Sequence, residues 1–136
     1  MEVHYSSKSN EWDTPQKLFN ELNEEFNFTL DPCATDENAK CNKHFTIEDD
    51  GLSKDWSKDV VFMNPPYGRE IKKWIKKAYE ESLNGATVVC LIPARTDTTY
   101  WHDFIFDKAD DIRFLRGRLK FGNSKNSAQF PSAIVL

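Results

Sequence analysis

The stretch VVFMNPPYG, residues 60–68, joins a continuous apolar run to a proline turn. VVFM is typical of a strand buried on both faces of a sheet, because no polar residue alternates with the apolar ones. Pro65 and Pro66 have no backbone N–H to donate, so neither a helix nor a central strand continues through them. The turn carries an amide, Asn64, and an aromatic ring, Tyr67, at its two ends. The turn is either an ordinary surface turn or a rigid binding site for a flat polar ligand.

Helical and strand patterns alternate on both sides of this turn. Residues 14–26 have apolar side chains at helical spacing, with Thr14 as the expected N-cap and Pro15 at the first helical position. Residues 69–85 repeat the helical pattern and end at Gly85, the expected C-cap, and residues 98–109 predict a third helix. Strands are expected at 28–32, 44–47, 59–64, 86–93 and 132–136, and a strand or hairpin around Gly117 at 112–121.

This alternation predicts a single α/β domain, residues 1–136, with a mostly parallel sheet, helices on both faces and a C-terminal β-hairpin. In such sheets ligands bind beyond the carboxyl ends of the strands. Three expected strand ends carry polar or proline-rich residues, and we expect them on one rim: Asp31-Pro32, Asn64-Pro65-Pro66-Tyr67 and Pro93-Ala94-Arg95.

Composition narrows the class of protein. The 136 residues suffice for one core, and 39% hydrophobic residues indicate a globular chain. The longest apolar runs are far shorter than a membrane helix, and the first residues do not resemble a secretion signal. The chain has three cysteines, an odd number, and their spacing does not match a disulfide framework. This favours a protein that works in a reducing cytoplasm. We therefore expect a cytoplasmic protein without a membrane partner.

The net charge of −4 conceals a gradient along the chain. Residues 1–59 carry 6 basic and 14 acidic side chains, whereas residues 112–136 carry 5 basic side chains and no acidic one. This asymmetry fits a protein that holds a cationic cofactor in one region and a polyanion in another. Solvated charges scattered by chance are the alternative.

A series of motifs extends from Trp12 to the end of the sequence: EWDTPQKLFNELNEEFNFTLDPCA (11–34), EDDGLSKDW (48–56), VVFMNPPYG (60–68), IPARTDTTYWHDFI (92–105) and FLRGRLKFG with FPSAIVL (114–122 and 130–136). In this order the series resembles the phage-type DNA N6-adenine methyltransferases, which use S-adenosylmethionine and carry the NPPY motif. The resemblance implies a Rossmann-like methyltransferase fold. It also implies phage or prophage origin, a bacterial host cell, and a role such as restriction-modification.

The implied reaction is direct in-line methyl transfer from S-adenosylmethionine to the exocyclic N6 of a flipped adenine in DNA. That amino group is a poor nucleophile, because its lone pair is delocalised into the ring. The resemblance implies that the Asn64 side chain and the Pro65 carbonyl accept hydrogen bonds from this amino group. It also implies that Pro66 stiffens the turn and that Tyr67 stacks on the flipped base. These four residues are the expected catalytic residues.

The resemblance also implies which residues bind the cofactor. Asp31 suits the cationic methionine end, the WDTP motif touches the same end, and Asp50 matches the acidic position that binds the cofactor's adenine. DPCATDEN, residues 31–38, stands where many methyltransferases have a Gly-x-Gly loop. The expected cofactor-binding residues are Trp12, Thr14, Pro15, Asp31, Cys33, Ala34, Asp49 and Asp50.

Double-stranded DNA is the implied partner, and basic side chains would contact its phosphates. The chain is too short for a separate target-recognition domain, so base choice is expected from the loops 34–45 and 121–131, and the protein is expected to be a monomer. The expected DNA-binding residues are Arg69, Lys72, Arg95, Arg116, Arg118 and Lys120.

Other readings of the same residues stay open. The chain could be a non-catalytic cofactor- or DNA-binding remnant, or it could methylate RNA or a protein glutamine. Zinc binding by Cys33, Cys41 and His44 is disfavoured, since a fourth ligand is not evident, and no metal is expected. Cys33 as a nucleophile is disfavoured too, because the catalytic turn carries NPPY.

Overall fold

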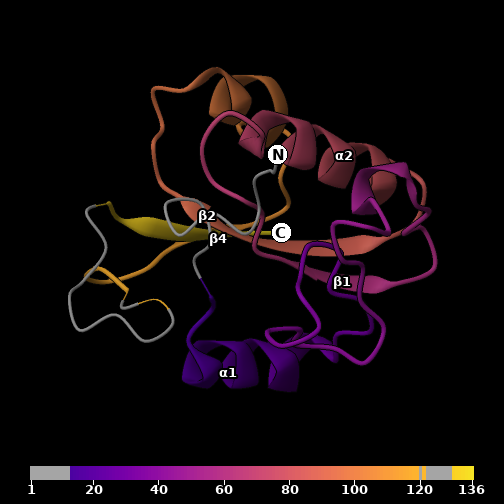
Figure 1. Ribbon diagram of the computed structural model, residues 1–136. Helices are drawn as coiled ribbons and strands as arrows, with labels where there is room; N and C mark the ends of the chain where they lie inside the picture. Colours follow the sequence, from indigo (N-terminus) through magenta and orange to yellow (C-terminus); the bar gives the residue numbers. More distant parts are fainter. Residues whose placement is uncertain (1–12, 120, 122–129) are drawn as a thin grey trace.

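The computed structural model describes residues 13–119, 121 and 130–136. In these residues the strands form one four-stranded sheet in the order β1-β2-β4-β3, shown in Figure 1. The strands are β1 (Val60–Met63), β2 (Thr87–Pro93), β3 (Ile112–Phe114) and β4 (Ser132–Val135). The predicted α/β class is confirmed, and the apolar runs at residues 60–63 and 87–93 form neighbouring strands.

One half of the sheet is parallel. β1 pairs with β2 in parallel, with Val60 opposite Thr87. Beyond β1, Leu30 forms a parallel bridge with Val61, and Asp31 forms one with His44. The predicted strands at 28–32 and 44–47 therefore contribute single bridges rather than full strands, yet they extend the parallel arrangement to the residues that follow Leu30.

The other half is antiparallel, and the prediction of a mostly parallel sheet was wrong. β4 runs antiparallel to both β2 and β3, so two of the three pairings between the described strands are antiparallel. Apolar residues along SAIV specify burial, which the structure confirms, but they do not specify strand direction. β3 and β4 pair antiparallel at the C-terminal side of the sheet, whereas the expected hairpin around Gly117 is not seen in the described residues, where Gly117 lies in a bend after β3.

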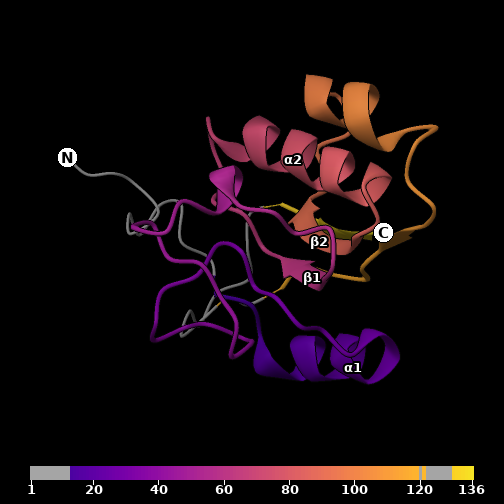
Figure 2. The same ribbon diagram turned by 90° about the vertical axis from the view of Figure 1, so that its right-hand side faces the viewer.

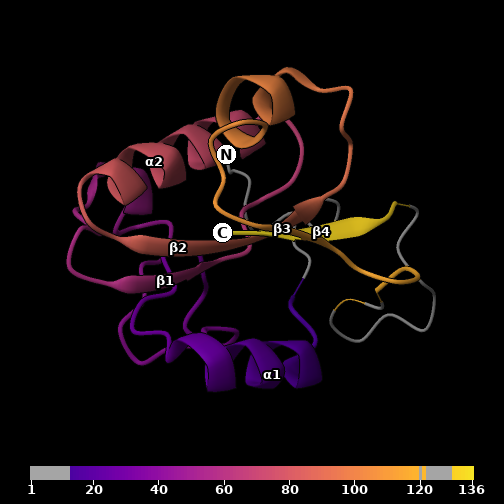
Figure 3. The ribbon, with the colours of Figure 1, turned by 180° about the vertical axis from the view of Figure 1, so that it is seen from behind.

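Helices cover both faces of the sheet, as predicted. Figures 1 and 3 show α1 (Gln16–Phe26) on one face and α2 (Ile71–Leu83) on the other. Figure 2 shows the short helix η2 (Trp101–Ile105) on the same face as α2. The α1 side chains Phe19 and Leu22 are buried, and so are Ile71, Trp74, Ile75 and Ala78 of α2.

The helix ends differ from the predicted caps. Pro15 is the N-cap of α1, and the Thr14 side chain does not cap the helix. At the C-terminal end of α2, Asn84 rather than the predicted Gly85 is the C-cap, and Gly85 follows it with a φ of 117°. Gly51 begins the short 3₁₀ turn η1 (Gly51–Ser53), which packs against α2.

Within the ranges described, no helix has the length and apolar character needed to cross a membrane.

Candidate functional site

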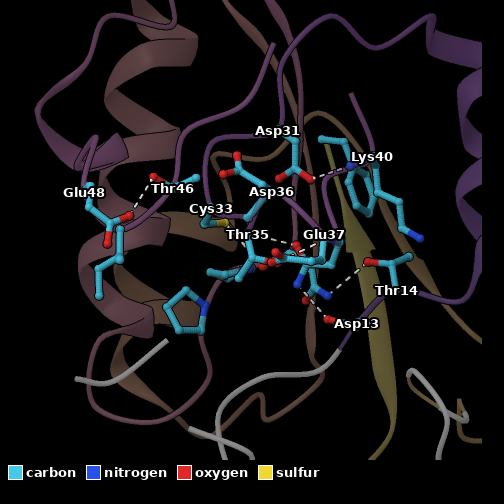
Figure 4. A pocket seen from close by; sticks show the side chains of 17 residues that line it. Asp13, Thr14, Asp31, Cys33, Thr35, Asp36, Glu37, Lys40, Thr46 and Glu48 are labelled. Atoms are coloured by element: carbon cyan, nitrogen blue, oxygen red, sulfur yellow. Dashed lines mark hydrogen bonds between the residues drawn. The ribbon is translucent and has the colours of Figure 1, made fainter. Parts of the chain in front are cut away.

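A pocket of about 270 Å³ lies at the carboxyl ends of the parallel segments (Figure 4). Its walls contain seven of the predicted site residues and ten that were not predicted. The predicted ones are Thr14, Asp31, Cys33, Ala34, Asn64, Pro65 and Pro66. The others are Asp13, Thr35, Asp36, Glu37, Asn38, Lys40, Thr46, Ile47, Glu48 and Phe62.

The parallel arrangement explains why Asp31 and Asn64 share this pocket. Leu30 is bridged to Val61 in parallel, so the chain leaves the sheet at the same edge after both segments. A hydrogen bond from the Cys33 thiol to the backbone carbonyl of Asn64, 3.3 Å, joins the two turns. The predicted common rim therefore exists for Asp31-Pro32 and Asn64-Pro65-Pro66, whereas Pro93, Ala94 and Arg95 do not line the pocket.

The Asn64 side chain is fixed from the N-terminal side. Its Nδ2 donates a hydrogen bond to Thr14 Oγ1, 3.0 Å, across 50 residues of sequence. The neighbouring Asp13 accepts a hydrogen bond from Asn38 Nδ2, 2.8 Å, so the segment before α1 is attached to both walls of the pocket. Figure 4 shows Asp13 and Thr14 side by side, each with its dashed bond.

Asp31 is a buried carboxylate in the pocket wall, with 5% of its surface exposed. It accepts a hydrogen bond from the backbone N–H of Lys40 at 3.0 Å. Burial raises the pKa of Asp31 to about 6, although the backbone N–H groups of Lys40 and Cys33 act in the opposite direction. Near neutral pH the Asp31 carboxylate is therefore ionised but poorly solvated. A bound cation would offset the free energy lost by desolvation of this charge.

Negative charge dominates the pocket walls. Of the described lining residues, five are acidic and Lys40 is the basic one; the acids are Asp13, Asp31, Asp36, Glu37 and Glu48. Asp36 also contacts His44 Nε2 at 2.8 Å, which raises the pKa of that histidine. An acidic concave surface favours a cationic ligand.

Tyr67 lies away from the pocket. Its ring is 6% exposed, and its hydroxyl donates to the Leu91 carbonyl at 3.2 Å. Phe121 and Phe130 meet the ring edge to face, with centroid distances of 6.2 and 5.6 Å. The structure thus buries the ring that was expected to stack on a base.

Three of the predicted cofactor residues do not line the pocket either: Pro15, Asp49 and Asp50. Asp49 accepts a hydrogen bond from the backbone N–H of Thr46, 2.9 Å, in a local turn. Asp50 is exposed, with a φ of 57°, because it turns the chain into η1. The adjacent Thr46, Ile47 and Glu48 contribute to the wall instead.

The loop at residues 34–40 supplies half of the ten lining residues that were not predicted as site residues. Thr35 N–H donates to Asn38 Oδ1 at 2.7 Å, and Asn38 N–H donates to Thr35 Oγ1 at 3.1 Å. A Thr followed three residues later by an amide is a recognisable signal for such a reciprocal turn. Read in that way, the segment TDEN would have indicated an ordered loop beside Asp31.

The predicted DNA-binding residues that are described lie mostly at the surface. Arg69, Arg95, Arg116 and Arg118 are exposed. Lys72 is also exposed, but its ammonium contacts Asp103 at 3.2 Å. Arg95 lies over the Phe130 ring, 5.1 Å from its centroid, and thereby adjoins the aromatic group around Tyr67. Trp12 and Lys120 lie outside the described residues.

The cysteine and histidine side chains near the pocket do not form a metal centre. Among residues 13–119, 121 and 130–136, no group of three or more His, Cys, Asp or Glu side chains is arranged to hold a metal ion. Desolvation raises the pKa of the Cys33 thiol well above its ordinary value, which makes it a poor nucleophile.

Comparison with known proteins places the chain in a family. The model of the DNA N-6-adenine-methyltransferase (Dam) family matches residues 4–133. The DNA N-6-adenine-methyltransferase of Haemophilus phage HP1 is 30% identical over 121 residues, which cover 87% of this chain and 69% of that protein. The enzyme of the same name from Escherichia phage T1 is 32% identical over 92 residues, 66% of this chain and 38% of that protein. The chain belongs to the family of DNA N-6-adenine-methyltransferases.

Proposed function

We propose that this protein transfers a methyl group from S-adenosylmethionine to the exocyclic N6 of adenine in DNA, on a Rossmann-like scaffold. The observation that carries the proposal is one acid-lined pocket whose wall contains both Asp31 and the turn Asn64-Pro65-Pro66. A group that attracts a cation and a group that accepts hydrogen bonds from an amine are therefore neighbours. The family supplies the reaction class, since its relatives are named as adenine methyltransferases.

The acidic and apolar side chains that line the pocket fit S-adenosylmethionine. When bound, this cofactor supplies a methyl group on a positively charged sulfur. The ionised Asp31 carboxylate would attract its cationic methionine end, and Glu48 stands on another stretch of the same wall. Ile47, which is 42% exposed and lines the pocket, offers an apolar contact to the purine part. Cys33 and Ala34 complete the expected contacts on the Asn64 side.

Asn64 and Pro65 would act on the target base. The Asn64 side-chain oxygen and the Pro65 carbonyl accept hydrogen bonds from the adenine amino group, which favours a nitrogen whose lone pair points at the methyl group. The two prolines keep both acceptors in a fixed relation, so that orientation contributes to the rate. The adenine has to leave the base stack to reach this turn.

Tyr67 keeps its proposed role in stacking on the flipped base, with a condition that the structure adds. Phe121 and Phe130 cover its ring edge to face, so a base reaches Tyr67 only if one of them moves. Both flank residues 122–129 in the sequence, within the loop 121–131 proposed for base choice. Movement of Phe121 or Phe130 on DNA binding would thus uncover the ring.

Double-stranded DNA would be held by the exposed cations Arg69, Arg95, Arg116 and Arg118, together with Lys72 and Lys120, in a monomer. Arg95 adjoins Phe130, which contacts Tyr67, so phosphate binding would occur beside the catalytic turn.

Methyl transfer from labelled S-adenosylmethionine to unmethylated double-stranded DNA tests the proposal. Digestion to nucleosides should give label in N6-methyldeoxyadenosine, and the Asn64→Ala variant should give far less of it in the same time. Parallel reactions with RNA and with a protein fraction distinguish the substrate classes. Label confined to RNA or protein would refute the DNA assignment, and cofactor binding without transfer to any of the three would indicate a non-catalytic protein.

A further inference from the structure

We infer that Thr14 is a positioning residue, whose hydroxyl accepts a hydrogen bond from Asn64 Nδ2 and so holds the Asn64 side-chain amide in place. The inference rests on the proposed function, because it assigns a task to Asn64. Thr14 was expected to cap α1 or to touch the cofactor's methionine end, and neither task explains its geometry.

The hydroxyl of Thr14 is committed to Asn64. Thr14 is 5% exposed, and its Oγ1 lies 3.0 Å from Asn64 Nδ2. The helix that follows begins at Gln16 with Pro15 as its N-cap, without a side-chain capping bond. The Thr14 hydroxyl therefore bonds a residue 50 positions away rather than the end of the helix.

A primary amide can be placed in two orientations that exchange its oxygen and its nitrogen. With Nδ2 directed at Thr14, the amide oxygen of Asn64 occupies the opposite side of the group. In the proposed reaction this oxygen accepts a hydrogen bond from the adenine amino group. The reversed amide would present N–H donors to an amino group that is itself a donor, and the reacting nitrogen would lose its acceptor.

The main chain of Asn64 is held separately, so the contribution of Thr14 is confined to the side chain. The Cys33 thiol donates to the Asn64 carbonyl at 3.3 Å, and Pro65 and Pro66 are both buried. Removing the Thr14 hydroxyl should therefore leave the turn in place and release the amide.

Two variants test this arrangement. Thr14→Val keeps the shape of the side chain and removes the hydroxyl, whereas Thr14→Ser keeps the hydroxyl and removes a methyl group. Single-turnover transfer at saturating S-adenosylmethionine should be slower by about tenfold or more in Thr14→Val, since a misplaced catalytic group costs up to about 10²-fold. Thr14→Ser should stay within about threefold of wild type, and the cofactor Kd should change by less than about threefold in both variants, because the lost bond joins two protein groups.

Nuclear magnetic resonance of the cofactor-free protein provides a readout that does not depend on activity. The side-chain amide pair that disappears in Asn64→Asp identifies the Asn64 NH₂ signals. In Thr14→Val these signals should shift and exchange faster with water, and in Thr14→Ser they should stay close to wild type. An unchanged Asn64 NH₂ in Thr14→Val would overturn the inference.

Kinetic outcomes also separate this inference from the proposed function. If wild type methylates DNA adenine and Thr14→Val is as fast, the positioning role is refuted while the function stands. An equal loss in Thr14→Ser and Thr14→Val would assign the effect to packing, and a parallel loss of cofactor affinity would assign it to cofactor binding; both outcomes refute the role. If wild type transfers no methyl to adenine, the proposed function fails, whatever the amide signals show.

Discussion

The Asp31 carboxylate accepts a hydrogen bond from the backbone N–H of Lys40, nine residues further along, and this pair forms one wall of the acid-lined pocket. The bond turns the loop that replaces a glycine-rich segment back onto the strand end. It also holds a buried carboxylate beside open pocket volume. Since burial raises the pKa of Asp31 to about 6, the charge of the pocket depends on pH in an accessible range.

Cofactor binding should follow the ionisation of Asp31. Below pH 6 the neutral carboxyl no longer attracts a cation, so the affinity for S-adenosylmethionine should fall by up to tenfold per pH unit. Asp31→Asn should bind more weakly at pH 7.5 and show a flatter profile between pH 5 and 7, measured by calorimetry. His44→Gln is the control, because the pKa of His44 is also raised. Identical profiles for wild type and Asp31→Asn would contradict the assignment.

The stability of the cofactor-free protein should change in the opposite sense. A raised pKa means that the native state binds more protons than the unfolded state between about pH 4 and 6, so stability falls as pH rises through that window. Asp31→Asn removes this cost, which amounts to about 3 kcal/mol above pH 6. Its gain in unfolding free energy over wild type should shrink towards pH 4 in urea titrations, and a gain that does not change with pH would contradict the raised pKa of Asp31.

Asn64→Ala should separate catalysis from cofactor binding. Loss of the acceptor should lower the transfer rate by about 10²–10³-fold, while the affinity for S-adenosylmethionine stays within a few-fold. Quenched single-turnover kinetics measure the transfer rate, and equilibrium binding to the same preparation measures the affinity for the cofactor. A large loss of cofactor affinity would mean that Asn64 holds the cofactor rather than the base.

Glu81 should be a major contributor to stability although it lies outside the site. It is 7% exposed, accepts the Trp56 backbone N–H at 2.7 Å and contacts Lys77 at 3.1 Å. Glu81→Ala leaves a buried donor and a partly buried cation without this partner, and should cost about 3 kcal/mol. The adjacent exposed Glu80→Ala should change the unfolding free energy by less than about 0.5 kcal/mol. Equal effects in urea titrations would refute the role of Glu81.

Gly51 should tolerate no side chain, because a Cβ there would collide with the Pro32 carbonyl oxygen and meet the Trp74 ring at 3.2 Å. Gly51→Ala should therefore destabilise the protein by about 1–3 kcal/mol and weaken cofactor binding through displacement of the Asp31-Pro32 turn. Gly117→Ala, where the added atom meets nothing within 4 Å and φ is 71°, measures the backbone cost alone. Cofactor affinity equal to wild type in Gly51→Ala would show that the turn does not move.

The sequence predicted those parts of the molecule that local patterns determine. Helical spacing located α1 and α2, and continuous apolar runs located β1, β2 and β4. The rule that ligands bind beyond the strand ends placed Asp31 and Asn64 on one rim, and both residues line the pocket. The family resemblance of the whole chain is confirmed by the match to residues 4–133.

The remaining errors share a physical cause, since they concern long-range partners. An apolar strand buries itself equally well in either direction, so the antiparallel placement of β4 was not visible in SAIV. Thr14 obeyed a capping rule in the sequence, but a tertiary bond to Asn64 prevailed. The sequence likewise did not show that Phe121 and Phe130, more than 50 residues later, pack against the ring of Tyr67, which remains proposed to stack on the base.

The position of β4 has a consequence for synthesis of the protein. β4 is the last of the described strands in the chain, yet it lies between β2 and β3. While the ribosome has not yet added residues 132–135, β2 keeps an unpaired apolar edge, and β3 has no neighbour in the sheet. The β2–β4 and β3–β4 pairings therefore form only after translation of these residues, and until then the edge of β2 is of the kind that favours aggregation.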